Sequence, residues 1–151
     1  MIKTITDISF FPEVAIVTLN NVPNTPGSIA SILGIIAENN ISIDMISQTA
    51  PYKDKINLSF TISEDDLGAV IVLTGKFKSL APSINTDING NNTKILLSGE
   101  GMRIESGVAA ELFALLAKEN IRVKLITTAE TEISCLIDIK DVETAKKILS
   151  E

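Results

Sequence analysis

The chain has 151 residues, a formal net charge of −6 and a hydrophobic content of 45%, which fit one ordinary domain or two small ones. The acidic charge and an aromatic content of 4% argue against nucleic acid as a partner, because a phosphate backbone requires clustered Lys and Arg and bases stack on aromatic rings. The absence of His and the presence of only one Cys, Cys135, exclude imidazole catalysis, a disulfide framework and a cysteine or histidine metal site.

The apolar residues are distributed in short segments. No apolar stretch approaches the ~20 residues of a membrane helix, and the first residues, MIKTITDISFF, lack the continuous apolar segment of a signal peptide. We therefore expect a cytoplasmic protein with no membrane partner. Two small lobes bury only modest cores, so the surplus of apolar residues predicts contacts between chains.

Two segments of the chain repeat one pattern with a shift of 80 positions. They are GSIASILGIIAENNISIDMISQ (27–48) and GVAAELFALLAKENIRVKLITT (107–128). A repeat of this length predicts two copies of a small folding unit. Differences between the copies then point to function, because packing constrains both copies alike.

The first copy predicts the element order β-α-β-β-α-β. Its first helix has clear boundaries: Thr25 is suited to the N-cap, Pro26 to the first helical position, and Asn40 to the left-handed conformation after the last turn. The other expected elements are strands at 13–20, 41–49, 56–62 and 82–88, a hairpin turn at 51–54 and a helix at 65–75.

The second copy predicts the same order with one strand missing. Its expected elements are strands at 93–99, 121–128 and 133–139 and helices at 106–118, opened by Ser106, and at 141–150. The missing strand would leave an unpaired apolar sheet edge, whereas residues 2–9 form a short strand with no assigned partner. We therefore expect a first domain at 10–90 that is inserted into a second domain made of 1–9 plus 91–151.

The quoted motifs resemble those of a known family. PNTPGSIASILGIIAENNISIDMISQ resembles the first ACT domain of aspartate kinase (aspartokinase) regulatory regions, and GEGMRIESGVAAELFALLAKENIRVKLITTAETEISCLID resembles the second. The resemblance implies an α+β fold of two ferredoxin-like ACT domains, with antiparallel sheets and helices on one face. It also implies a non-catalytic allosteric module of amino-acid biosynthesis that has no cofactor, binds an amino-acid effector such as lysine or threonine, forms a homodimer and acts on a kinase catalytic domain or subunit.

The residues of the first copy predict a pocket for a free amino acid. The start of the helix near Gly27 suits the ligand carboxylate, because helix N-termini offer unpaired amides and a positive dipole end. Ser42, Asp44 and Gln48 share parity on the following strand and therefore project from one side. Asp44 suits the ligand ammonium, and Gln48 suits a polar group of the ligand.

The resemblance places the ligand contacts at the positions of Asn24, Gly27, Ile29, Ser42, Asp44 and Gln48. Asn24 replaces a common Asp and Ser42 a common Asn, which weakens the case for lysine and leaves threonine or another small amino acid. Lys124 occupies the position that Asp44 has in the first copy, so we expect the second pocket to be weak or unused.

Two further candidates lie in the second copy. Met102 and Glu130 are candidate ligand contacts, and the alternatives are a gap-filling methionine and a structural carboxylate. For the whole chain, one alternative is a structural dimerisation module that binds no small molecule. Another is a small enzyme of the acylphosphatase type, which requires an Arg between a strand and a helix; residues 20–27 contain none.

Overall fold

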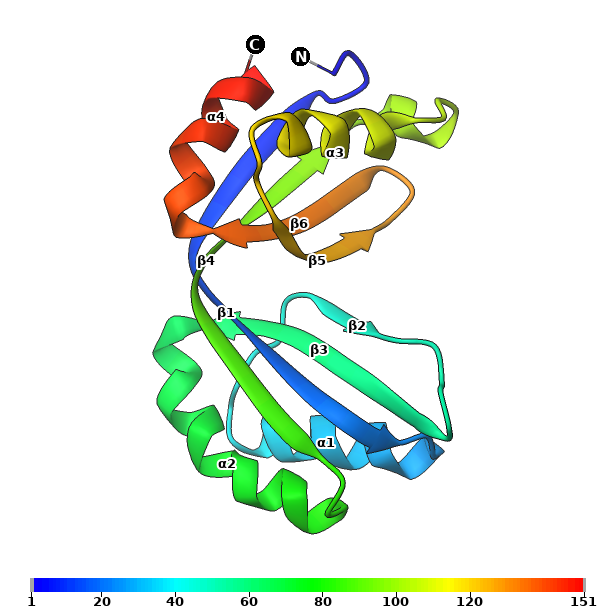
Figure 1. Ribbon diagram of the computed structural model, residues 1–151, viewed down its shortest axis with the longest axis vertical. Helices are drawn as coiled ribbons and strands as arrows, with labels where there is room; N and C mark the ends of the chain where they lie inside the picture. The colour runs from blue at the N-terminus through cyan, green and yellow to red at the C-terminus, as the bar shows by residue number, and fades with distance from the viewer. Residues whose placement is uncertain (1, 151) are drawn as a thin grey trace. The chain divides into compact units, whose positions relative to one another are not determined.

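The computed structural model describes residues 2–150 and divides the chain into two compact units (Figure 1). The central unit is Val14–Gly90, and the terminal unit contains the residues up to Glu13 and those from Asn91 onward. Strands β1 (Asp7–Pro23) and β4 (Asn85–Ser98) contribute residues to both units. Each unit has its own hydrophobic core.

The central unit is a four-stranded antiparallel sheet with the order β2-β3-β1-β4 and two helices on one face. Its elements are α1 (Pro26–Glu38), β2 (Ile46–Gln48), β3 (Lys55–Ser63), η1 (Glu64–Asp66) and α2 (Leu67–Leu80), together with parts of β1 and β4. Alternate residues of β3, from Ile56 to Ile62, face the core. There they meet Ile32 of α1 and Phe77 of α2, which are fully buried.

The terminal unit has the same architecture, with its strands in the order β1-β4-β6-β5. Its own elements are η2 (Glu100–Arg103), α3 (Val108–Lys118), β5 (Val123–Thr128), β6 (Glu132–Asp138), η3 (Ile139–Asp141) and α4 (Val142–Ser150). Residues 7–13 of β1 supply the fourth strand, and directly before them the Thr6 N–H donates to the Ser98 carbonyl at 2.8 Å. Ile2 and Ile5 are buried in this core.

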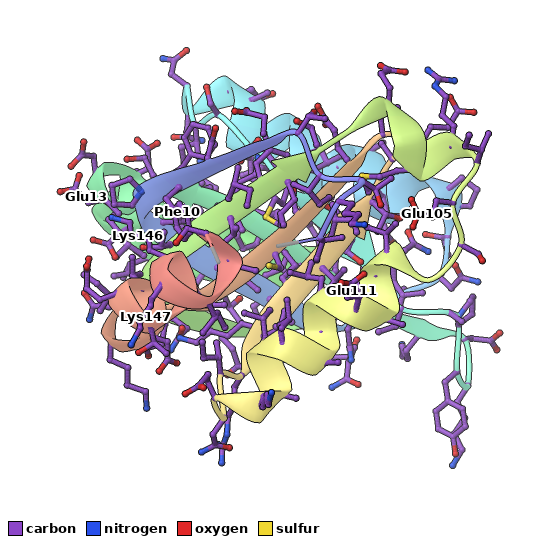
Figure 2. All side chains as sticks on the ribbon, turned by 90° about the horizontal axis from the view of Figure 1, so that it is seen from above. Phe10, Glu13, Glu105, Glu111, Lys146 and Lys147 are labelled. Atoms are coloured by element: carbon purple, nitrogen blue, oxygen red, sulfur yellow. The ribbon has the colours of Figure 1, made fainter. Side chains whose placement is uncertain are left out.

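In the terminal unit, one cation–π contact connects the last helix with the first strand. The Lys146 ammonium of α4 lies 5.5 Å from the centre of the Phe10 ring of β1 (Figure 2). Phe10 is itself partly buried against the core. A cation above an aromatic face is attracted by the ring quadrupole, so this contact supports the packing of α4 on β1.

The repeat is visible in the way α1 and α3 end. Asn40 and Asn120 both have a φ of 56°. Their N–H groups donate to the carbonyls of Ala37 and Ala117, and the following residue in each copy, an isoleucine, donates to the carbonyl five positions back. This is the Schellman arrangement, which satisfies the last carbonyls of a helix. The predicted end of the first helix is confirmed.

Several predicted boundaries are wrong. The strands expected at 2–9 and 13–20 merge into the single strand β1, which begins only at Asp7, so residues 2–6 are not strand. Those expected at 82–88 and 93–99 merge into the single strand β4, which begins only at Asn85. The strand expected at 41–49 is reduced to β2, because the Thr61 hydroxyl accepts a hydrogen bond from the Met45 N–H at 2.9 Å and interrupts the regular pairing.

Of the two predicted N-caps, Thr25 does occupy the N-cap position of α1, whereas Ser106 is not the N-cap of α3. The Thr25 hydroxyl bonds the Ser28 hydroxyl at 2.7 Å and caps no amide of α1. Helix α3 begins after Gly107, which has a φ of +86° and takes the cap position expected for Ser106. Glycine adopts this backbone conformation at little cost because it has no Cβ.

Candidate functional site

One half of the candidate site lies at the start of α1. Asn24 and Gly27 are exposed, and the space where a Cβ of Gly27 would lie is open to 4 Å. Ile29 packs partly buried against the core. The helix has no side-chain cap and no acidic residue in its first turn. Its positive dipole end is therefore open to an anionic group.

The other half lies on the segment that leads into β2. Ser42 and Asp44 are exposed and alternate with the buried residues Ile41 and Met45. Gln48 is exposed in β2, where it is paired with Leu58. Because alternate residues of an extended chain face the same side, the three polar side chains project away from the core.

Within one central unit Gly27 and Asp44 lie at opposite ends of α1. The Asp44 N–H donates to the Thr61 carbonyl, and Thr61 pairs with Ile16. The strand from Ile16 to Pro23, directly before the helix start, spans roughly 20 Å at about 3.3 Å per residue. The structure therefore does not bring Asp44 beside Gly27 of the same unit.

Met102 and Glu130 belong to a looped region of the terminal unit. Met102 packs partly buried against the core. The Glu130 carboxylate accepts a hydrogen bond from Nη1 of Arg103 at 2.6 Å, and Nε of Arg103 donates to Glu100 at 3.2 Å. Glu130 thus ties η2 to the loop that follows β5.

In the terminal unit, the residue equivalent to Asp44 is a lysine that is bonded to polar side chains. The Lys124 ammonium donates to Oδ1 of Asn92, which is fully buried, and to Oδ2 of Asp138 at 3.3 Å. The hydrogen bond from the Lys140 backbone N–H lowers the pKa of Asp138 below its ordinary value; Lys124 adds to this effect, and partial burial opposes it.

A cavity of about 330 Å³ opens beside this ion pair and is lined by Asn120, Arg122, Lys124, Asp138, Lys140 and Asp141. Arg122 and Lys140 line this cavity, although neither is among the candidate residues expected from the sequence. The signal for Arg122 was present in the repeat, because the same position of the first copy is Ser42. Lys140 lies beyond the repeated segment, and only the fold brings it to Arg122.

Other kinds of site find no support in the described residues. Cys135 is fully buried, and desolvation raises the pKa of its thiol to about 12, which makes it a poor nucleophile at neutral pH. Between residues 2 and 150, no group of three or more His, Cys, Asp or Glu side chains is arranged to hold a metal ion. No helix in the same range is long and apolar enough to cross a membrane.

Comparisons with known proteins agree with this architecture. Two family models, each described as an ACT domain, match residues 17–71 and 95–151. Aspartokinase of Helicobacter pylori is 39% identical over 133 residues, which are 88% of this chain and 32% of the relative. The chain thus spans about a third of the length of the curated relatives it matches.

Some solved structures match this chain over nearly the full length of both chains. A chain in a structure of aspartokinase alpha and beta subunits is 33% identical, with a TM-score of 0.86 that covers 96% of this chain and 95% of that chain. The ligand-free regulatory subunit of aspartate kinase from Thermus thermophilus has the same fold, with a TM-score of 0.88 at 23% identity over 98% and 97% of the two chains. The predicted α+β fold of two ACT domains is confirmed, and the chain belongs to the aspartate kinase family as a tandem ACT-domain regulatory region.

Proposed function

We propose that this regulatory region binds a free amino acid and transmits its presence to an aspartate kinase catalytic domain or subunit. The observation that carries the proposal is the uncapped start of α1, with open space at Gly27. An amino acid offers a carboxylate for this helix start and an ammonium for an exposed carboxylate such as that of Asp44. Ligand coupling of this kind is typically worth about 1–3 kcal/mol.

A complete pocket requires two copies of the chain. The helix start and Asp44 of one central unit lie roughly 20 Å apart along the strand direction, whereas the carboxylate and ammonium of an amino acid are attached to the same carbon. A homodimer can solve this problem: in a two-fold interface that joins the two surfaces, the helix start of one copy meets the strand segment of the other. We assign Gly27 to one copy and Asp44 and Gln48 to its partner.

The polar residues around this pocket favour a small neutral effector. Asn24 is uncharged, so it offers no carboxylate to a cationic ligand side chain. Ser42 has a short side chain whose hydroxyl can hydrogen-bond a polar group of a small ligand. Threonine fits this set better than lysine does. The only carboxylate that we assign to the pocket, Asp44, is then used by the ligand ammonium.

A screen of thermal unfolding with each of the twenty amino acids tests the proposal. A bound effector raises the melting temperature by mass action, and the Asp44→Asn variant should lose that shift. Asp66→Asn removes an equivalent charge from the same unit outside the pocket and should keep it. If no amino acid at millimolar concentration raises the melting temperature of the wild-type chain, the proposal is wrong.

The second candidate is a dimerisation module without a ligand. It is favoured by two exposed isoleucines at equivalent positions of the two edge strands, Ile46 in β2 (44% exposed) and Ile126 in β5 (45% exposed). Exposed apolar edges promote pairing with another chain. A dimer with no amino-acid response in the same screen would select this candidate.

A further inference from the structure

The cavity of the terminal unit has a size and a composition suited to a small polar ligand. Its volume of about 330 Å³ lies at the lower end of the range for ligand pockets, roughly 300–1,000 Å³. Its lining carries three cationic side chains, Arg122, Lys124 and Lys140, and two carboxylates, Asp138 and Asp141. The pocket proposed above for an amino acid uses none of these residues.

Hydrogen bonds identify the equivalent surface of the central unit. The Ser63 hydroxyl accepts a hydrogen bond from the Asp65 N–H at 3.3 Å, and the Asp138 carboxylate accepts one from the Lys140 N–H at 3.0 Å. Both acceptors end the third strand of their unit and cap a short 3₁₀ helix. Ser63 therefore corresponds to Asp138, and Asp65 corresponds to Lys140.

The charge of this surface is reversed between the two copies. In the central unit the four equivalent positions are occupied by Ser42, Asp44, Ser63 and Asp65, and in the terminal unit by Arg122, Lys124, Asp138 and Lys140. Two carboxylates thus give way to three cations and one carboxylate. Packing does not require this reversal, because the four side chains lie outside the two hydrophobic cores.

The cations of the terminal unit have different local partners. Lys124 is held by Asn92 and Asp138. In contrast, the side chains of Arg122 and Lys140 are exposed, and neither forms a side-chain hydrogen bond or a salt bridge with the part of the chain that the structure describes, although the Lys140 charge acts on the Asp138 carboxylate. These two cations line the cavity together and are available to a ligand.

We propose that the cavity of the terminal unit binds a small oxyanion, a carboxylate or a phosphate group, through Arg122 and Lys140. Guanidinium groups bind both kinds of oxyanion with two parallel hydrogen bonds, and Lys140 adds a second positive charge. Lys124 repels the ammonium of an amino acid from the position that corresponds to Asp44. The region would then carry two unlike sites, and this second site does not depend on the amino-acid pocket of the central unit.

Calorimetric titration of the whole chain tests this site with inorganic phosphate and with succinate as separate probes. Low ionic strength is required, because salt weakens the attraction between exposed charges, with a screening length of about 10 Å at 0.1 M. A chloride titration at matched ionic strength is the control. We expect one probe molecule per chain. Arg122→Gln and Lys140→Gln should each weaken binding by on the order of tenfold, the loss expected for one charge-assisted hydrogen bond.

Lys118→Gln provides the matched variant, because it removes one positive charge from an exposed position of α3 that does not line the cavity. It should bind the probes as the wild-type chain does. Binding of only one probe identifies the oxyanion and supports the proposal. The proposal is overturned if neither probe binds, if Lys118→Gln weakens binding as much as Arg122→Gln does, or if Arg122→Gln and Lys140→Gln change only the oligomeric mass.

Discussion

Asn40 and Asn120 have a left-handed backbone in both copies of the repeat, directly after the last turn of α1 and of α3. For a residue with a Cβ, this conformation normally costs roughly 1–2 kcal/mol. The cost is lower for Asn, because its side chain forms hydrogen bonds with the nearby backbone. The pair recurs at the spacing of the repeat because each helix must turn sharply into the next extended segment.

Replacement of Asn40 separates this backbone effect from side-chain contacts. Asn40→Ala should lower the free energy of unfolding by about 1 kcal/mol, whereas Asn40→Gly should leave it unchanged or raise it slightly. Urea unfolding measures both variants, and the Asn120 pair should behave in the same way. Equal losses in the Ala and Gly variants would show that the amide side chain, and not the backbone, is responsible.

Asp138 makes the stability of the terminal unit dependent on pH. Its pKa is lowered in the folded protein, first by the Lys140 N–H and then by Lys124, so its stabilising effect is present above the ordinary carboxyl pKa of about 4 and is lost as the pH falls through the folded value. Wild-type protein should be more stable than Asp138→Asn near neutral pH, and this difference should shrink on acidification. Urea unfolding that gives the same difference at acidic and neutral pH would contradict this.

At the scale of elements, local signals predict better than distant ones. Pro26 and Asn40 mark α1 correctly because both act within one turn of the helix. The shortening of β2 could not be predicted, because it depends on the Thr61 hydroxyl, which is brought there by the fold. The same holds for the candidate pocket. The repeat in the sequence indicates Gly27 and Asp44 as candidate residues, but the distance between them depends on the strand register and could not be predicted.

Close approach of the N-terminal segment to the end of β4 requires glycine at position 99 of the terminal unit. A Cβ at Gly99 would overlap the Thr4 backbone carbonyl, whereas a Cβ at Gly34 in α1 would meet nothing within 4 Å. Gly99→Ala should therefore destabilise the protein by roughly 1–3 kcal/mol, and Gly34→Ala should stabilise it by up to about 1 kcal/mol. Thermal unfolding compares them, and a neutral Gly99→Ala would contradict the close packing of residues 2–5.

For the whole molecule, the most distinctive feature is that the N-terminal segment completes the terminal unit: residues 7–13 of β1 complete its sheet, and the residues before them fill its core. Ile2 and Ile5 are 3% and 6% exposed, and both belong to that core. The sequence predicts this arrangement by strand counting alone, because a unit with an unpaired apolar edge is unfavourable. The central unit, in contrast, is one continuous segment of the chain.

The double variant Ile2→Ala/Ile5→Ala should therefore weaken one unit selectively. Loss of two buried isoleucine side chains costs on the order of 3 kcal/mol or more. Hydrogen exchange should show faster exchange in residues 91–98 of β4 and in β6 and α4 of the terminal unit, while β3 and α1 of the central unit retain their protection. Lys3→Ala, at an exposed position between the two, is the control. An equal loss of protection in both units would contradict the assignment of residues 2–5 to the terminal unit.

The central claim is that the amino-acid pocket is shared between two copies, and a subunit-mixing titration tests it most directly. Gly27→Asp places a carboxylate at the helix start, where it repels the ligand carboxylate, and Asp44→Asn removes the partner of the ammonium, so neither variant alone should bind the effector. After dissociation and random reassociation of an equal mixture, half of the dimers contain one copy of each variant, and about a quarter of all pockets are intact. Calorimetry should then recover about a quarter of the wild-type stoichiometry; a mixture that binds no more than its separate components would contradict the claim.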